Sequence, residues 1–349
     1  MTALRVFHRW LALITAVLVV VVAVSGSALV FEGAIDRALN PQLWRVDPGA
    51  SAVSLDTLVA HASAAAPKMP VTGLGLSTVP GRAFVAQAGP MQVFEDPYTG
   101  KVLGTRDVRL FQKTLPRRLH VLHTALLTGK RGSAVVAIIT IASLVLVLTG
   151  IVLWLPDRIF RITSTASWKR VVFDLHHALG VLAAIVLVII TASGLVIHYD
   201  ALRDAIFKLD KSPAPFADEQ SAMPRGTPTI SMDTLALIAR RALPGASITF
   251  LNTPPNAQQS FQVSMRFPED RTPGGRSRIL VDRYSGDILL AVSTRQAEPG
   301  TRINNVIRSV HTGDLYGKPT QLIWFLAALI MASQAVTGAL MWWNARRKR

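Results

Sequence analysis

Four uncharged stretches limit what this chain can fold into. Each lacks Asp, Glu, Lys and Arg and has about the 20 residues that a helix needs to cross the hydrocarbon core of a bilayer. The stretches are residues 11–31, 134–155, 178–199 and 322–343. Because backbone polar groups inside a bilayer must be satisfied within the segment, each stretch is predicted to be a transmembrane helix. A cleaved signal peptide is the alternative for the first stretch, but its apolar residues continue through Phe31, which favours a retained helix.

The basic residues next to these stretches predict their orientation. Lys and Arg in short flanking segments stay on the cytoplasmic side of a membrane. Such residues precede the first stretch, separate the second from the third and end the chain: Arg5, Arg9, Arg158, Arg161, Lys169, Arg170, Arg346, Arg347, Lys348 and Arg349. Both termini and the 156–175 loop are therefore expected in the cytoplasm, and the two long segments on the opposite side.

The composition excludes several classes of function. The chain has no cysteine, which excludes disulfides, thiolate metal sites and thiol nucleophiles. Its formal net charge of +16 is shared between both sides of the membrane, so contact with the lipid bilayer explains it and no nucleic-acid partner is expected. No carboxylate lies in a predicted span, which argues against a proton-pumping relay.

A long motif occurs twice, which indicates an internal duplication. The motif consists of a His-Thr pair, a Gly-Lys pair, a Thr-Gly pair and a Trp, and its copies are 188 residues apart. The copies are His123-Thr124, Gly129-Lys130, Thr149-Gly150, Trp154 and His311-Thr312, Gly317-Lys318, Thr337-Gly338, Trp342. A shorter motif relates His8 and Ser25-Gly26 to His176 and Ser193-Gly194, 168 residues later.

The two long segments between the spans repeat as well. Residues 54–58 resemble residues 231–235, and each set begins an apolar-periodic stretch with a helix cap. Alternating segments follow, joined at their ends by matching turns at 96–100 and 282–286, and are predicted to be strands. The predicted strands are 71–77, 83–88, 91–95, 101–103, 247–251, 260–267, 278–282 and 287–292. The extra residues of the second copy are expected in loops near Gln258 and at 271–275.

Together these patterns predict a membrane α+β fold. Four transmembrane helices form two parallel-repeat halves with a pseudo-two-fold axis along the membrane normal, and two α+β modules lie in the periplasm. The expected parts are transmembrane helix 1–32, module 33–120, interfacial and transmembrane helices 121–155, cytoplasmic loop 156–175, transmembrane helix 176–199, module 200–310, and an interfacial helix, transmembrane helix and basic tail at 311–349.

The duplicated histidines form two predicted pairs. His8 and His176 lie at the cytoplasmic ends of equivalent helices, and His123 and His311 lie toward the periplasmic side. Opposed imidazoles on facing helices can fill both axial positions of a haem iron, so each pair is predicted to bind one haem. Interfacial histidines that only cap or snorkel are the alternative. His198, near the periplasmic end of the third span, is the alternative ligand in place of His123 or His311.

The number of residues between each histidine of the second pair and the end of its motif places this pair outside the spans. His123 precedes Trp154 by 31 residues, which is about 46 Å of unbroken helix and more than a bilayer core. Helix breaks are therefore expected at the two Gly-Lys pairs, with His123 and His311 on short interfacial helices. The repeated Thr-Gly and Trp positions are interpreted as packing and anchoring residues.

These motifs resemble those of a known family. The His-Thr-x-x-Leu-x-Gly motif, the Thr-Gly-x-x-x-Trp that follows it, the Asp174-Leu175-His176 entry to the third span and the Asp-x-Tyr-x-Gly turns resemble the PepSY-associated transmembrane proteins. Within that family the chain is similar to inner-membrane siderophore reductases of the FoxB type. The resemblance implies PepSY-like modules, a place in the bacterial inner membrane, and two haem b groups with His8, His123, His176 and His311 as axial ligands.

The resulting hypothesis is a ferric-chelate reductase, an oxidoreductase that acts on metal ions. Electrons from an unidentified cytoplasmic or quinol donor would enter at His8 and His176, pass to His123 and His311, and reduce a ferric siderophore, which releases ferrous iron. No Rossmann or flavin fingerprint is present, so the reductant is expected from outside the chain. Two other classes stay open: a siderophore or iron transporter without redox activity, and a membrane-anchored module that regulates peptidases or binds proteins.

Overall fold

The computed structural model describes residues 1–111, 115–156, 158, 160, 162, 167–208, 221 and 228–346. The chain forms two units, each built from more than one segment. The helical unit comprises Met1–Glu32, Leu115–Ile206 and Val306–Arg349, and the sheet unit comprises Gly33–Thr114 and Phe207–Asn305. Arg161 and residues 347–349, which contributed to the predicted orientation, lie outside the described residues.

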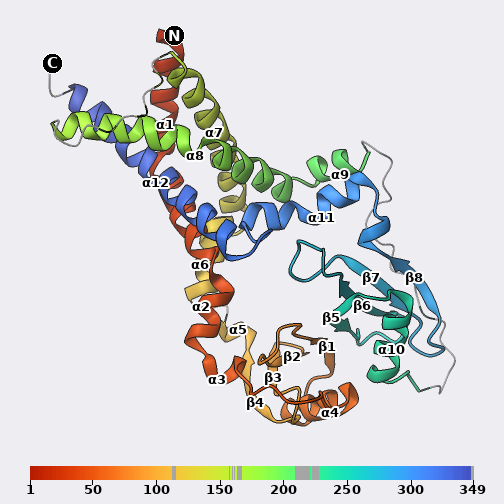
Figure 1. Cartoon of the computed structure of the whole chain (residues 1–349). Coiled ribbons are helices and arrows are strands. Elements are labelled where there is room, and N and C mark those ends of the chain that lie inside the picture. The colour runs from red at the N-terminus through yellow and green to blue at the C-terminus, as the bar shows by residue number, and fades with distance from the viewer. Residues whose placement is uncertain are drawn as a thin grey trace. The chain divides into compact units, whose positions relative to one another are not determined.

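Four long helices make up most of the helical unit. They are α1 (Thr2–Leu29), α7 (Lys130–Trp154), α8 (Trp168–His198) and α12 (Lys318–Arg346) (Figure 1). Each is long and apolar enough to cross a membrane, in agreement with the four predicted spans. Contacts link them in a closed ring in the order α1, α7, α8, α12, so α1 and α8 lie on one diagonal. The first turns of α8 occupy part of the 156–175 segment that was expected to be a loop.

Short helices precede α7 and α12, as predicted. α6 (Leu115–Ala125) carries His123 and α11 (Pro299–Thr312) carries His311, and both end before the Gly-Lys pairs. Gly313 directly follows α11 with a φ of +75°, and a Cβ at this position would lie 2.6 Å from the Trp324 ring. Only glycine combines this backbone conformation with so close an approach, so the sequence ends the helix here.

The eight strands formed by the described residues belong to one antiparallel sheet. They are β1 (Val71–Gly75), β2 (Phe84–Ala88), β3 (Met91–Glu95), β4 (Val102–Asp107), β5 (Ser247–Asn252), β6 (Phe261–Arg266), β7 (Ser277–Val281) and β8 (Ile288–Val292). Their order in the sheet is β4-β3-β2-β1-β5-β6-β7-β8. At the centre β1 pairs with β5, where Leu74 lies opposite Leu251. The two modules predicted as separate are therefore one unit, and this pairing covers two strand edges that would otherwise be open.

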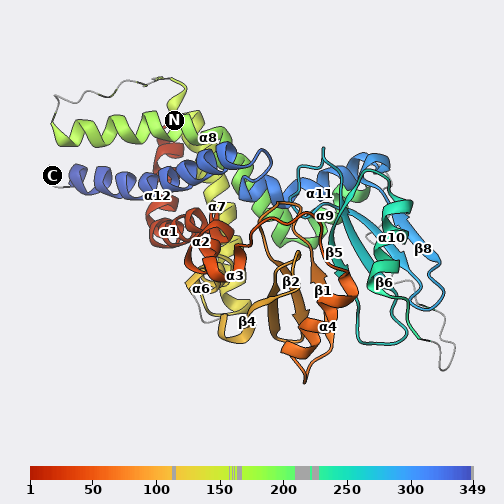
Figure 2. The same cartoon turned by 60° about the horizontal axis from the view of Figure 1, so that its bottom comes forward.

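Two helices, α4 (Leu55–Ala65) and α10 (Met232–Ala242), cover one face of this sheet (Figure 2). Leu58 from α4 and Leu235 from α10 are fully buried, and they share one hydrophobic core with residues of strands on both sides of the β1–β5 pair. Burial of such leucine side chains is worth about 1.5–3 kcal/mol each, so the shared core stabilises the joined sheet.

The two helices are also capped across the junction. Ser54 and Ser231 accept hydrogen bonds from the first turns of their own helices, as predicted. In addition, Asp233 accepts a hydrogen bond from the backbone N–H of Leu55 at 2.9 Å, and Asp56 accepts one from Met232 at 2.8 Å. Each carboxylate thus satisfies an N–H group at the start of the other helix, where negative charge is favourable.

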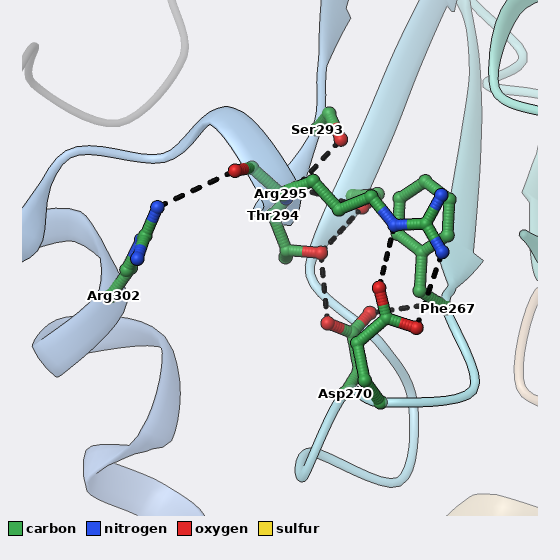
Figure 3. Close-up of polar contacts among 8 residues, drawn as sticks. Phe267, Asp270, Ser293, Thr294, Arg295 and Arg302 are labelled. Atoms are coloured by element: carbon green, nitrogen blue, oxygen red, sulfur yellow. Dashed lines mark hydrogen bonds and ion pairs between the residues drawn. The ribbon is translucent and has the colours of Figure 1, made fainter.

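Part of the extra length of the second half lies in one loop. Residues 267–276 join β6 to β7, whereas only residues 89–90 join β2 to β3, which confirms the expectation for 271–275. The β5–β6 and β1–β2 loops have equal lengths, so the expectation near Gln258 was wrong. The Thr294 hydroxyl donates to Asp270 at 2.8 Å, and Arg295 lies over the Phe267 ring at 3.9 Å (Figure 3). These contacts fix the loop against the chain after β8.

The remaining helices of the described residues are α2 (Glu32–Leu39), α3 (Pro41–Trp44), α5 (Val108–Phe111), α9 (Asp200–Lys208) and η1 (Thr294–Gln296).

One carboxyl group is buried in the sheet unit without a hydrogen-bond partner among the described residues. Glu95, at the end of β3, is 0% exposed, and neither of its carboxyl oxygens has a hydrogen-bond partner among the described residues. Burial raises the pKa of Glu95 to about 8. The corresponding end of β7 is occupied by Val281, which is also buried. Glu95 is therefore held in its neutral form in the folded protein at pH 7.

Glu95→Gln is expected to stabilise the sheet unit increasingly as pH rises. The unfolded chain releases the Glu95 proton near pH 4.5, whereas the folded chain keeps it until about pH 8, so wild-type stability falls between these values. The difference reaches on the order of 4 kcal/mol at pH 8, or roughly 10 °C in melting temperature, and is small at pH 5. Thermal unfolding of the purified full chain between pH 5 and 8 measures it. Glu298→Gln, which removes an exposed carboxyl of the same unit, is the control, and equal effects at pH 5 and pH 8 would contradict the prediction.

Candidate functional site

The first histidine pair, His8 and His176, lines a cavity inside the helical unit. The cavity has a volume of about 490 Å³, within the range of cofactor and ligand pockets, and its lining comes from all four long helices. His8 lies on α1 and His176 on α8, the helices that share a diagonal of the ring. Arg5 and Arg9 also line the cavity and place positive charge beside the histidines.

Threonine hydroxyls orient both imidazoles of this pair. His8 Nδ1 lies 2.8 Å from Thr149 Oγ1, and His176 Nδ1 lies 2.8 Å from Thr337 Oγ1. Thr149 Oγ1 also lies 2.8 Å from the Val145 carbonyl, and Thr337 Oγ1 lies 2.7 Å from the Ser333 carbonyl. With its proton donated to that carbonyl, each hydroxyl accepts from the Nδ1–H of its imidazole. In this arrangement Nε2 of both rings is left without a proton.

The second histidine pair, His123 and His311, is brought together by α6 and α11. The ring centres are 6.1 Å apart and the ring planes are inclined by 40°. His123 Nδ1 donates to the Val22 carbonyl at 2.9 Å, and His311 Nδ1 donates to the Ile190 carbonyl at 3.0 Å. A carbonyl oxygen cannot donate, so these rings have the same tautomer as the first pair and also keep Nε2.

The spacing of the second pair suits one metal ion between the rings. A histidine nitrogen binds a metal at about 2 Å, and two imidazoles on opposite sides of one ion hold their ring centres roughly 6 Å apart. Burial lowers the pKa of His311 to about 4 and also lowers the pKa of His123. Both side chains are neutral at pH 7, which is the form that binds metal.

Two glycines make room for the second pair. An added Cβ at Gly26 of α1 would lie 2.7 Å from His123 Cε1, and one at Gly194 of α8 would lie 3.0 Å from His311 Cε1. The rings therefore rest directly against the backbone of the long helices and reach the carbonyls of Val22 and Ile190. This contact explains the repeated Ser-Gly motif, for which the sequence offered no role.

The remaining histidines have other surroundings. His198, the predicted alternative ligand, is exposed at the end of α8 with its ring 4.7 Å from that of Tyr199. His177 lines the first cavity but donates from Nδ1 to its own helix at Phe173. His61 lies in the sheet unit, where it contacts the Gly100 carbonyl. Of the four symmetric histidines, His8 and His176 line one cavity, and His123 and His311 lie with their ring centres 6.1 Å apart.

The structure adds residues that sequence reasoning did not identify as part of the site. Thr149 and Thr337 were interpreted as packing residues, yet they hydrogen-bond the first pair. Gln334 of α12 also lines the cavity, and its buried amide nitrogen has no partner among the described residues. The repeated spacing of the Thr-Gly motif was the available signal for the threonines, but only the packed helices show what their hydroxyls touch.

Comparison with known proteins places this chain in a family of membrane proteins. A comparison with curated proteins found no match. The model of the PepSY-associated TM region matches residues 5–345, nearly the whole chain. The chain is therefore a membrane protein of the PepSY-associated TM family.

Proposed function

We propose that this protein carries electrons across the bacterial inner membrane through two haem b groups and reduces ferric siderophore iron in the periplasm. The observation that carries the proposal is the arrangement of four histidines in two pairs, each with Nδ1 hydrogen-bonded, which leaves Nε2 to bind iron. Metal-binding histidines typically donate their second N–H in this way. His8 and His176 would hold the cytoplasmic haem, and His123 and His311 the periplasmic one.

The residues present fit these groups. The first pair lines a cavity of ligand size, and Arg5 and Arg9 at its edge suit the carboxylates of a haem. The rings of the second pair lie 6.1 Å apart, so His123 and His311 would together hold the second haem. When bound, haem iron supplies one-electron redox chemistry. The chain's own residues fix the orientation of the imidazoles and surround the first site with apolar helices.

A parallel duplication supports the two-site arrangement. The contacts of one half recur in the other at the repeat spacing: His8 with Thr149 recurs as His176 with Thr337, and His123 with Val22 recurs as His311 with Ile190. We infer two halves related by an axis along the membrane normal, with both termini cytoplasmic and the PepSY-like sheet unit periplasmic. The ferric siderophore is the proposed substrate, and a cytoplasmic or quinol donor the proposed source of electrons.

Anaerobic reoxidation tests this function. Purified protein is reduced with dithionite, freed of excess reductant and mixed with a ferric siderophore and a chromogenic ferrous chelator. The proposal predicts loss of the reduced haem spectrum and formation of about two ferrous ions per chain, one for each haem. Reduced protein that keeps its spectrum and yields no ferrous iron with ferric hydroxamate, catecholate and citrate chelates would contradict it. Uptake of intact ferric siderophore into proteoliposomes without reductant would instead indicate a transporter.

A further inference from the structure

The two histidine pairs differ in what accepts their Nδ1 protons. Side-chain hydroxyls of Thr149 and Thr337 accept from the first pair. Main-chain carbonyls of Val22 and Ile190 accept from the second pair, with Ser193 Oγ also 3.4 Å from one of its rings. Nε2 is therefore the free ring nitrogen in both pairs. The groups that accept the Nδ1 protons differ, because they are side-chain hydroxyls in the first pair and main-chain carbonyls in the second.

The threonine hydroxyls are held in place for this contact. Thr149 Oγ1 donates to the Val145 carbonyl at 2.8 Å, and Thr337 Oγ1 donates to the Ser333 carbonyl at 2.7 Å. These bonds to the preceding helical turn fix the hydroxyl rotamer and aim an oxygen lone pair at the imidazole. Glycine follows each threonine, and the imidazole Cε1 lies 3.6 Å from an added Cβ at Gly150 and 3.5 Å from one at Gly338. Each ring is thus seated beside a small residue and oriented by one hydroxyl.

We propose that Thr149 and Thr337 are positioning residues that set the affinity of the first site for haem and for electrons, independently of the second site. The inference rests on the proposed haem function. An acceptor on Nδ1–H makes imidazole a stronger electron donor to a metal and favours the oxidised state. At the second site a main-chain carbonyl has this role, and substituting the side chain of the residue that carries the carbonyl does not remove it. At the first site the role belongs to a replaceable side chain.

Valine variants of the full chain test the proposal. Thr149→Val, Thr337→Val and the double variant keep the side-chain shape and remove the acceptor. Spectroelectrochemical titration of the haem-loaded protein is expected to show a rise in one of its two reduction potentials, with up to a tenfold increase in the ratio of reduced to oxidised haem at fixed potential, or 59 mV. The second potential should stay unchanged. Thr149→Ser and Thr337→Ser keep the hydroxyl and should restore the wild-type value.

Haem retention supplies a second readout and a control. Loss of the ligand-orienting contact is expected to weaken haem binding at the first site by about 10- to 100-fold in the double valine variant, and serine should restore it. Thr191→Val is the control, because Thr191 is a buried hydroxyl on α8 that donates only to its own helix at Leu187 and Val188.

Three outcomes would overturn the proposal. Two unshifted potentials and full haem retention in the double valine variant would show that the hydroxyls affect neither the reduction potential nor the haem affinity of the first site. Equal changes in Thr191→Val would show a general loosening of the bundle. Serine variants that behave like valine variants would show that shape, not the acceptor, matters. A wild-type protein without any haem would instead refute the proposed function, so the two failures are distinguishable.

Discussion

Replacing His123 with alanine is expected to remove one of the two haems and to leave the other in place. The ring centres of His123 and His311 lie 6.1 Å apart, so on the proposed function the alanine variant would lose one of the two side chains that would hold the haem there. The first pair belongs to a different part of the helical unit, where its cavity and its threonine contacts remain. Haem content should fall to about half, and the remaining spectrum should be that of the first site.

The reciprocal variant and two controls sharpen this test. His8→Ala should remove the other haem and leave the spectrum of the second site, so the two single-variant spectra should sum to that of the wild type. His198→Ala removes an exposed histidine of the same unit, and His61→Ala removes one from the sheet unit. Both controls should keep two haems. Full haem occupancy in alanine variants of all four paired histidines would refute the ligand assignment.

Gly26→Ala, which adds a single methyl group, is expected to weaken haem binding at the second site almost as much as His123→Ala does. The Cβ of Gly26→Ala would lie 2.7 Å from His123 Cε1, which is too close for the ring to stay in place. His123 would then lose its contact with the Val22 carbonyl and its alignment with His311. We expect haem retention at the second site to fall by at least 10-fold, measured by haem content after dialysis against apomyoglobin.

Glycines beside the first pair provide matched controls for this effect. An added Cβ at Gly150 lies 3.6 Å from His8 Cε1, and one at Gly338 lies 3.5 Å from His176 Cε1, which are ordinary contact distances. Gly150→Ala and Gly338→Ala should therefore keep both haems. Alanine is the better helix former by about 1 kcal/mol, so none of these substitutions weakens the helix itself. Equal haem loss at Gly26 and Gly150 would show that glycine acts through general helix packing and not through room for His123.

Local features of this fold could be predicted from the sequence. The four spans follow from uncharged runs of sufficient length, and the short helices of the second pair follow from a motif too long for one membrane crossing. The strands follow from alternation and turn residues, with boundaries shifted by a few residues. Each of these inferences uses residues close together in the chain, where periodicity and length carry the information.

Non-local contacts could not be predicted in this way. Alternation in β1 and β5 gives no sign that the two strands pair, and the capping of α10 by Asp56 depends on the same junction. The repeat spacing in the sequence identified the four histidines of the site. The groups that accept their Nδ1 protons lie on other helices of the bundle, so the sequence did not identify them. Thr149 was visible as a repeated residue, and its hydrogen bond to His8 follows only from how α7 packs against α1.

The absorbance spectrum of the purified full chain, with haem quantified per polypeptide before and after dithionite, tests the central claim most directly. The proposed function, with one haem at each histidine pair, predicts about two b-type haems per chain, both six-coordinate and low-spin in the oxidised and reduced states. Protein prepared with ample haem that contains none, or that contains only five-coordinate high-spin haem, would contradict the assignment of His8, His176, His123 and His311 as paired axial ligands.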